Sequence, residues 1–480
     1  MKLSKIWRPA LVSVALLAPA ALALAQPTTP APAPAPTPKG PPAPTPAASL
    51  RVAEPAATDP KITFERYTLP NGLEVILAPD KSVPLVSVSV WYHVGSGYEV
   101  YGRSGFAHLF EHMVFQGSKH VGDDKHFDIL KKIGSDSVNG TTNPDRTNYF
   151  EVVPSNQLET ALWLESDRMG YLLEKLTKKS LDNQIEVVRN ERRQRYDNVP
   201  YGKARFATYA ALYPEGHPYR YLTIGKHEDL EAASLEDVKN FFKTWYAPAN
   251  ATLTLSGDFE TATAKQLVTK WFGSFPKSVK PRVVPVPAPA IRSAQVVVED
   301  EFAKLRQVSF IWHSPANFAE GDAELDIAAN ALSREGPGRL YKALVYDRPL
   351  AQAVSAFQGG SQFSGIFQIT VTLRSEANLD EVKQIVAAEV ARLGREPLSE
   401  KEIARVIAGN EASAIRRLET VLGRGETLQA YNHYLGDPEK ISFDLDRYRK
   451  TTAEKIRTSV ARHLVPDRVV TVITNPKGAK

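Results

Sequence analysis

The 480-residue sequence contains no cysteine. Disulfide bonds, thiol catalysis and thiolate–metal sites are therefore excluded, and any bound metal ion would have to be held by His, Asp or Glu. The sequence also lacks a large surplus of either positive or negative charge. The formal net charge is +5, and because residues 1–25 carry three basic residues and no acidic one, the remainder carries only +2. That near balance argues against nucleic-acid binding, which usually requires a marked basic surplus.

Long apolar runs are confined to the N-terminus. Three basic residues precede an apolar stretch at residues 10–22, and Ala23-Leu24-Ala25 has the small-x-small pattern of a cleavage site. We therefore expect a signal peptide over residues 1–25, cleaved after Ala25, rather than an uncleaved anchor. No later segment has the roughly 20 apolar residues of a spanning helix. The sequence predicts a periplasmic or secreted protein without stable membrane insertion.

Proline is distributed unevenly and marks the predicted boundaries. Residues 26–49 hold 10 of the 35 prolines, so we expect an extended Pro/Ala-rich linker there. A second Pro-rich run, at 276–292, interrupts both helical and strand patterns. It is predicted to join an N-terminal domain at 50–275 to a C-terminal domain at 293–480.

The two predicted domains share one plan. An amphipathic helical stretch ending at Pro248 precedes the alternating strand 251–256, and a similar stretch ending at Pro466 precedes the strand 468–474. Such repetition indicates duplicated domains. Alternating strands beside amphipathic helices predict an α+β fold, in which each domain is a mainly antiparallel sheet with helices packed on one face.

The segment GFAHLFEHMVFQG, at 105–117, carries the candidate chemistry. On a helix, His108 and His112 project from one face one turn apart, and Glu111 borders that face. Two imidazoles in this arrangement can bind zinc, and a neighbouring carboxylate can accept a proton from water. The helix is apolar nearly all round, where a charged Glu111 is costly unless it is paired or bound. This H-x-x-E-H pattern therefore predicts a metal site.

A third protein ligand must come from elsewhere. Glu191 shares a predicted helix face with apolar residues of the stretch that begins at Leu181. Glu165 also lies on an apolar helix face. Periodicity alone does not choose between the two glutamates.

The H-x-x-E-H segment and Glu191 resemble the pitrilysin (M16) metallopeptidases. The resemblance covers about residues 62–475 and continues in three segments, at 139–149, 161–169 and 217–219. It is greatest to the short two-domain bacterial members and to the mitochondrial processing peptidase beta subunit. It implies a zinc endopeptidase acting on unfolded peptides, with one Zn²⁺ per chain bound by His108, His112 and Glu191. Glu111 would be the general base.

The resemblance also implies where a peptide binds. Residues 137–148 resemble the edge strand to which an extended substrate adds through backbone hydrogen bonds. Asn139, Gly140 and Thr141 are the predicted substrate-binding residues. The alternative is an ordinary hairpin rich in Asn and Thr.

Two departures from the family pattern concern the C-terminal half. The position 220 residues after His108 is Ala328, and no metal ligand accompanies it. Active members also use an Arg and a Tyr to hold the substrate, and the matching positions here are Val345 and Gln352, with Arg348 out of register. We therefore expect the zinc-bearing subunit of a heterodimer, whose homologous partner lacks H-x-x-E-H and supplies the Arg/Tyr pair. The alternative is a non-catalytic binding or assembly subunit.

Overall fold

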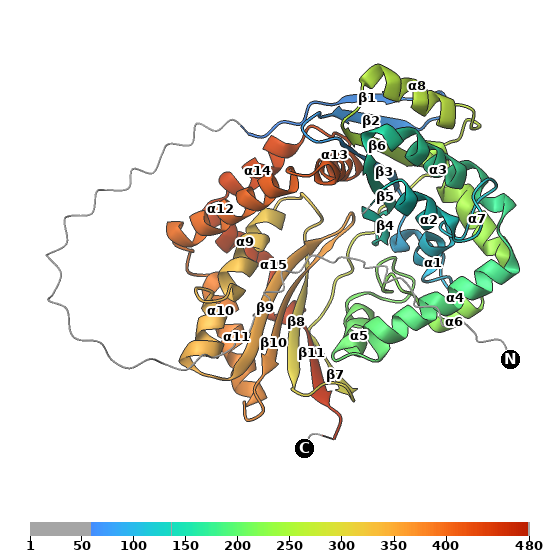
Figure 1. Cartoon of the computed structure of the whole chain (residues 1–480). Coiled ribbons are helices and arrows are strands. Elements are labelled where there is room, and N and C mark those ends of the chain that lie inside the picture. The colour runs from blue at the N-terminus through green and yellow to red at the C-terminus, as the bar shows by residue number, and fades with distance from the viewer. Residues whose placement is uncertain (1–58, 136, 479–480) are drawn as a thin grey trace, which may run out of the picture. The chain divides into compact units, whose positions relative to one another are not determined.

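Two β-sheets organise the residues that the computed structural model describes, 59–135 and 137–478 (Figure 1). The predicted signal peptide and the 26–49 linker lie outside these residues. The first sheet has the order β1-β2-β6-β3-β5-β4 and the second β7-β11-β8-β10-β9. The strands of the first sheet are β1 Glu65–Thr68, β2 Glu74–Pro79, β3 Leu85–Tyr92, β4 Ser137–Thr142, β5 Thr147–Pro154 and β6 Ala251–Gly257. Those of the second are β7 Ala294–Asp300, β8 Gln307–Ser314, β9 Ala351–Gly360, β10 Gly365–Leu373 and β11 Val470–Pro476.

Each sheet is antiparallel apart from one parallel pair. That pair is β2 with β6 in the first sheet and β7 with β11 in the second. The last strand of each half, β6 or β11, therefore lies between a parallel and an antiparallel neighbour in both sheets. The predicted fold class, α+β with two duplicated, mainly antiparallel sheets, is confirmed.

Fifteen α-helices accompany the sheets in the described part of the chain. Those that precede β7 are α1 Phe106–Met113, α2 Lys125–Lys132, α3 Leu158–Tyr171, α4 Lys178–Arg192, α5 Gly202–Leu212, α6 His227–Glu231, α7 Leu235–Trp245 and α8 Thr261–Phe272. Those that follow β8 are α9 Asp322–Ser333, α10 Arg339–Tyr341, α11 Leu379–Leu393, α12 Glu400–Arg417, α13 Val421–Leu435, α14 Ile441–Arg449 and α15 Ala453–His463. None of the described helices is both long and apolar enough to cross a membrane.

Several helices begin where the sequence places a capping residue. Thr177, Ser234 and Ser399 each accept a hydrogen bond from the backbone N–H three residues later, and a side chain there bonds back to the cap. These reciprocal bonds satisfy backbone donors that have no partner within the helix. The bonds at Thr177 fix the start of α4, which carries Glu191.

The alternation of strand β3 separates an apolar face from a polar one. Val86, Val88 and Val90 belong to the first hydrophobic core, together with residues of α1, α3 and α8. Ser87 and Ser89 point the other way and are also fully buried. They are covered by α13, a helix from the C-terminal half, which lies beside β3 and β6 (Figure 1).

The exchange of helices is reciprocal. Helix α5, from the N-terminal half, packs against β7 and β11 of the second sheet (Figure 1). Its Ala204 and Leu212 join a hydrophobic cluster with Val470 and Val472 of β11. Each sheet is therefore covered on one face by helices of its own half and on the other by one helix of the opposite half. The sequence did not predict this second layer.

The internal repeat is visible in the connections. A short 3₁₀ turn at Pro248–Asn250 leads into β6, and one at Pro466–Arg468 leads towards β11. Residues 276–293, which include the predicted inter-domain linker, contain neither helix nor strand.

Candidate metal centre

Helix α1 begins at a backbone contact that requires glycine. Gly105 has φ +89° and Gly225 has φ +71°, and a Cβ on Gly225 would lie 2.5 Å from the Gly105 Cα. The Glu99 carboxylate accepts hydrogen bonds from the backbone N–H groups of Gly105 at 2.9 Å and Ala107 at 2.8 Å. Glu99 therefore takes the place of a local capping side chain and fixes the start of the helix that carries both histidines.

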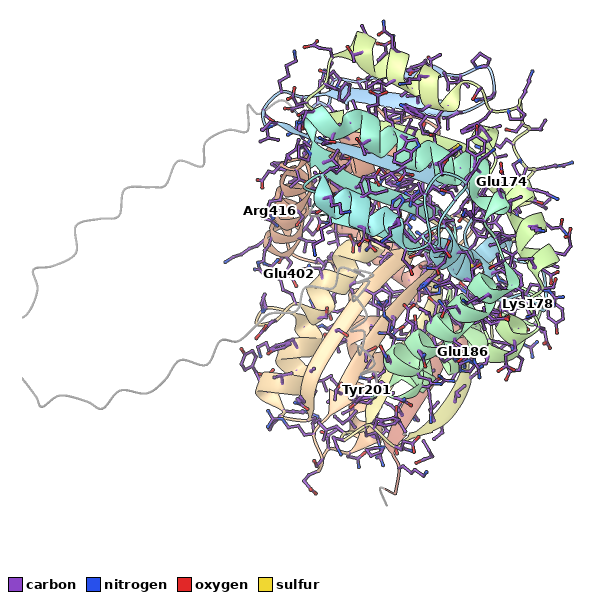
Figure 2. The ribbon with its side chains drawn as sticks, turned by 45° about the vertical axis from the view of Figure 1, so that its right-hand side comes forward. Glu174, Lys178, Glu186, Tyr201, Glu402 and Arg416 are labelled. Carbon is purple, nitrogen blue, oxygen red and sulfur yellow. The ribbon has the colours of Figure 1, made fainter. Side chains whose placement is uncertain are left out.

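Helices α1 and α4 pack together and bring three predicted residues to one point. One carboxylate oxygen of Glu191, Oε2, lies 3.5 Å from His108 Nε2 and 3.3 Å from His112 Nε2. The face of α4 that carries Glu191 also buries Leu181, Ile185 and Val188, as its periodicity predicted. Glu186 lies on the exposed side of the same helix (Figure 2). It pairs there with Arg189.

The three side chains fit a zinc ion. In a tetrahedral site with metal–ligand bonds of about 2.1 Å, neighbouring ligand atoms stand about 3.4 Å apart. The two distances from Glu191 match that separation, and all three donor atoms lie within 4.8 Å of one another. Two imidazoles and one carboxylate form a known ligand set for catalytic zinc, with a fourth position left for water or substrate.

Electrostatics favour an ionised Glu191. Burial opposes ionisation, but the hydrogen bond with His112 and the charges of His108, His112 and Arg195 outweigh it and lower the pKa of Glu191 to about 2. Burial is the main reason that the pKa of His108 falls to about 3. Burial also disfavours the charged form of His112, but contacts with Glu191, Glu111 and Gln184 outweigh it and raise its pKa.

Glu111 lies beside this centre and is itself fixed. Its Oε2 accepts a hydrogen bond of 2.5 Å from the Thr142 hydroxyl of β4. Burial raises the pKa of Glu111, and His112 and Thr142 oppose that shift. A carboxylate with a raised pKa, next to a candidate metal site, is suited to accept a proton and release it again.

Strand β4, which contains the predicted substrate-binding residues Asn139, Gly140 and Thr141, is the last strand of the first sheet. Among the described residues it pairs only with β5. Gly140 faces α1, and a Cβ there would lie 3.0 Å from Glu111 Cγ. The structure therefore brings the predicted edge strand against the H-x-x-E-H helix.

Glu165, the other glutamate that periodicity allowed, has a different partner. Arg168 Nε donates to Glu165 Oε2 at 2.9 Å, and a second, shorter contact makes the pair bidentate. His126, Glu151 and Glu165 also offer potential ligand atoms within 4.8 Å of one another. Here, however, the buried guanidinium already supplies the positive charge, with Nη2 at 3.9 Å from Glu151 Oε2.

Val345 and Gln352, the positions expected to match the Arg and Tyr of the family, lie just before strand β9 and within it. Val345 packs against the second hydrophobic core, and Gln352 is exposed on β9. Arg348, the out-of-register candidate, is bound to Glu381 at 2.9 Å. Ala328, which corresponds to His108 in the repeat, is fully buried in the second core.

Sequence reasoning did not identify the roles of Glu99, Gln184 and Thr142. Gln184 lies at helical spacing from Leu181 and Val188 on the buried face of α4, and this spacing is the only sequence signal for its contact with His112. Thr142 follows the predicted Asn139–Thr141 segment directly. Glu99 carries no local pattern that predicts capping of a helix that begins seven residues later.

Comparisons with known proteins identify the class. The family described as "Insulinase (Peptidase family M16)" matches residues 74–212, and "Peptidase M16 inactive domain" matches residues 232–410. The chain belongs to the M16 zinc metallopeptidases, of the short two-domain type.

Individual relatives agree with that assignment. The chain is 28% identical over 361 residues to "Zinc protease PqqE" of Helicobacter pylori, covering 74% of this chain and 80% of the relative. It is 21% identical to "Uncharacterized zinc protease YmxG" of Bacillus subtilis, covering 86% of this chain and 99% of that protein. The crystal structure of a protease from Helicobacter pylori superposes with a TM-score of 0.80 at 25% identity, covering 87% of this chain and all of that one (100%).

Proposed function

We propose that this protein is a zinc-dependent endopeptidase that cleaves unfolded peptides. The observation that carries the proposal is that one carboxylate oxygen of Glu191 lies 3.3 Å from His112 Nε2 and 3.5 Å from His108 Nε2. Glu111 lies on α1, the helix that carries both histidines. His108, His112 and Glu191 would hold one Zn²⁺ per chain. A bound zinc ion supplies Lewis acidity towards a peptide carbonyl.

Peptide binding and proton transfer are carried out by strand β4 and by the side chains of Glu111 and Thr142. An extended peptide adds to the outer edge of β4, along Asn139, Gly140 and Thr141, through backbone hydrogen bonds that are largely independent of sequence. Glu111 accepts a proton from the attacking water and passes it to the leaving amine. The Thr142 hydroxyl keeps the Glu111 carboxylate on the β4 side of α1.

Zinc analysis and peptide hydrolysis with Glu111→Gln test this function. The variant should keep about one zinc per chain and lose at least about a hundredfold in turnover, because general acid–base catalysis contributes that much or more. A His108→Ala variant should lose the metal as well. Turnover that survives Glu111→Gln would reject Glu111 as the base.

We further propose that the active form is a heterodimer with a homologous M16 chain that lacks H-x-x-E-H. Val345 and Gln352 offer neither a cation nor a phenol, and the Arg348 guanidinium is bound to Glu381. Oxyanion-stabilising groups can contribute about 3–4 kcal/mol to catalysis. Adding a homologue that carries the Arg/Tyr pair should therefore raise turnover by at least about a hundredfold.

A non-catalytic assembly subunit is the second candidate, favoured by the same two substitutions. It predicts zinc binding without turnover both in the isolated chain and with the partner. Full activity of the isolated chain would reject both the heterodimer and the assembly subunit.

We also propose export to a periplasmic or extracellular compartment. Support comes from the basic, apolar and small-x-small pattern of residues 1–25. N-terminal sequencing of the protein recovered from the host should begin at Gln26. An intact N-terminus in the cytoplasmic fraction would reject the proposal.

A further inference from the structure

Strand β4 is held on both of its faces. On one side, Thr142 Oγ1 donates to Glu111 at 2.5 Å, and Gly140 lies against the same side chain. Because successive side chains alternate along a strand, Thr141 projects to the opposite side. The contacts of Thr141 therefore decide whether the second face of β4 is also fixed.

Thr141 is bound by two residues of the same hairpin. Its hydroxyl donates to Asn148 Oδ1 at 2.5 Å, directly across the β4–β5 pair. Arg146 Nη1 donates to the Thr141 carbonyl at 2.9 Å and to its hydroxyl at 2.5 Å. The Arg146 guanidinium in turn lies over the Trp91 ring, 4.9 Å from its centroid.

The other end of this chain of bonds is in the C-terminal half. Asn148 Nδ2 donates to Glu426 Oε2 at 2.9 Å, and Glu426 belongs to α13. The second oxygen of the carboxylate accepts from Ser89 Oγ at 2.6 Å and from Trp91 Nε1 at 3.1 Å. Glu426 is therefore bonded to three side chains from two strands of the first sheet.

We propose that Glu426 is a positioning residue that fixes the peptide-binding edge strand. Its carboxylate holds the Asn148 amide, the amide holds the Thr141 hydroxyl, and Thr141 keeps β4 aligned so that Thr142 meets Glu111. The proposal rests on the function proposed above, in which β4 receives the peptide and Glu111 is the base. The proposal gives the C-terminal half a direct part in shaping the site, although that half has Ala328 at the position that corresponds to His108.

Hydrogen–deuterium exchange of residues 137–142 tests the positioning without reference to activity. Glu426→Ala should increase exchange in β4 by about tenfold, because it removes a charged hydrogen bond that restrains the strand. Glu426→Gln keeps one acceptor and should have a smaller effect. Glu419→Ala, which changes an exposed residue of the same half, is the matched control and should leave β4 unchanged.

Kinetics provide the second readout. Glu426→Ala should lower kcat/KM for an unfolded peptide by about tenfold, mainly through KM, while zinc content stays at the wild-type value. If the wild type, with or without a partner, hydrolyses no peptide, the proposed function fails. The exchange measurement then still decides whether Glu426 positions β4.

Thr141→Val breaks the same series of hydrogen bonds at its other end, in a partly exposed side chain. It should increase β4 exchange as Glu426→Ala does, whereas Thr141→Ser should restore the wild-type rate. The double variant should be no faster than either single variant, because both break one chain of bonds. Wild-type exchange in Thr141→Val, or strictly additive effects, would overturn the proposal.

Discussion

At the scale of single residues, the contact between Gln184 and His112 has a measurable consequence. The Gln184 side chain is buried on α4 and hydrogen-bonds the His112 side chain. Outer hydrogen bonds of this kind orient metal-binding imidazoles, and their loss typically costs about 10–100-fold in metal affinity. Gln184→Leu should therefore weaken zinc binding by at least about tenfold.

Competition with a chelator of known affinity measures this change. Gln194→Leu alters an exposed glutamine just beyond α4 and serves as the control. Equal zinc affinity in the two variants would contradict a role for Gln184 in holding His112.

A second residue-scale prediction concerns the buried pair of Glu165 and Arg168. Both side chains are almost fully buried, and Arg168 also stacks over Tyr149, 4.5 Å from its ring centroid. Removing one partner of a buried ion pair leaves a charge without compensation and typically costs about 3–5 kcal/mol. Arg168→Met should lower the free energy of unfolding by that amount in urea titrations at pH 7.

The double variant Arg168→Met/Glu165→Gln should recover part of the loss, because it removes the charge of Glu165, the nearer of the two carboxylates that Arg168 contacts. Neither change should alter zinc content. A double variant less stable than Arg168→Met alone would show that the cost arises from packing and not from charge.

This pair also explains why the sequence left the third ligand open. Glu165 and Glu191 both occupy apolar helix faces, so helical periodicity treats them alike. The two carboxylates differ in their neighbouring groups. Arg168, one turn further along α3, pairs with Glu165, whereas α1 brings two imidazoles to Glu191. The local signal was an i,i+3 pair in sequence, but its burial depended on tertiary packing.

At the scale of elements, helix α13 approaches the first sheet closely at a glycine. A Cβ on Gly425 would lie 3.4 Å from Ser87 Oγ and 3.5 Å from Ser256 Cβ, which is ordinary van der Waals contact. Gly425→Ala should therefore fit and stabilise the protein by up to about 1 kcal/mol through helix propensity. Gly425→Leu should overpack the interface and cost about 1–3 kcal/mol.

Urea unfolding of the two variants compares these effects at one position. If Gly425→Leu were as stable as Gly425→Ala, α13 could not be packed against β3 and β6 as described.

The strands themselves were predictable, but their surroundings were not. Alternation predicted strands at 251–256 and 468–474, and the structure has β6 at Ala251–Gly257 and β11 at Val470–Pro476. Serines and threonines on alternate positions are also typical of a face exposed to water. In β3 and β6 that face is buried beneath α13, where Gln429 Nε2 donates to the Thr252 carbonyl at 2.8 Å. No local pattern distinguishes a polar face covered by a distant helix from one covered by solvent.

At the scale of the whole molecule, the reciprocal exchange of α5 and α13 makes the two halves depend on each other. A fragment of residues 59–282 lacks α13, so the buried polar face of its sheet would be open to solvent. A fragment of residues 283–478 lacks α5 and exposes the cluster formed by Val470 and Val472. Exposed apolar surface of this kind favours aggregation.

We expect each fragment alone to be poorly folded and the co-expressed pair to assemble into a stable complex. The cut lies within residues 276–293, where it breaks no helix or strand. Co-purification and circular dichroism of the pair check this expectation. Two fragments that unfold cooperatively on their own would contradict it.

The halves also meet at a buried histidine pair, which predicts a pH dependence of stability. His93 Nδ1 lies 2.7 Å from His433 Nδ1, and the rings are stacked 5.0 Å apart. Burial and then the charge of Lys280 lower the pKa of His93 to about 3, against the opposing charge of Glu74. Burial, His93, Arg146 and Lys280 also lower the pKa of His433.

An unfolded histidine has a pKa of about 6.5, so below that pH the unfolded state binds more protons than the folded one. The free energy of unfolding must then fall as the pH falls, by about 2 kcal/mol for His93 between pH 7 and pH 5. Urea unfolding at pH 7, 6 and 5 measures this slope. The variant His93→Gln/His433→Gln removes both titrating groups, so its stability should change less over the same range. If the wild type and the double variant lost stability equally as the pH falls, the histidine pair would contribute nothing to the slope. The folded and unfolded states would then take up equal numbers of protons at the pair, so the pair would be protonated in the folded state as well.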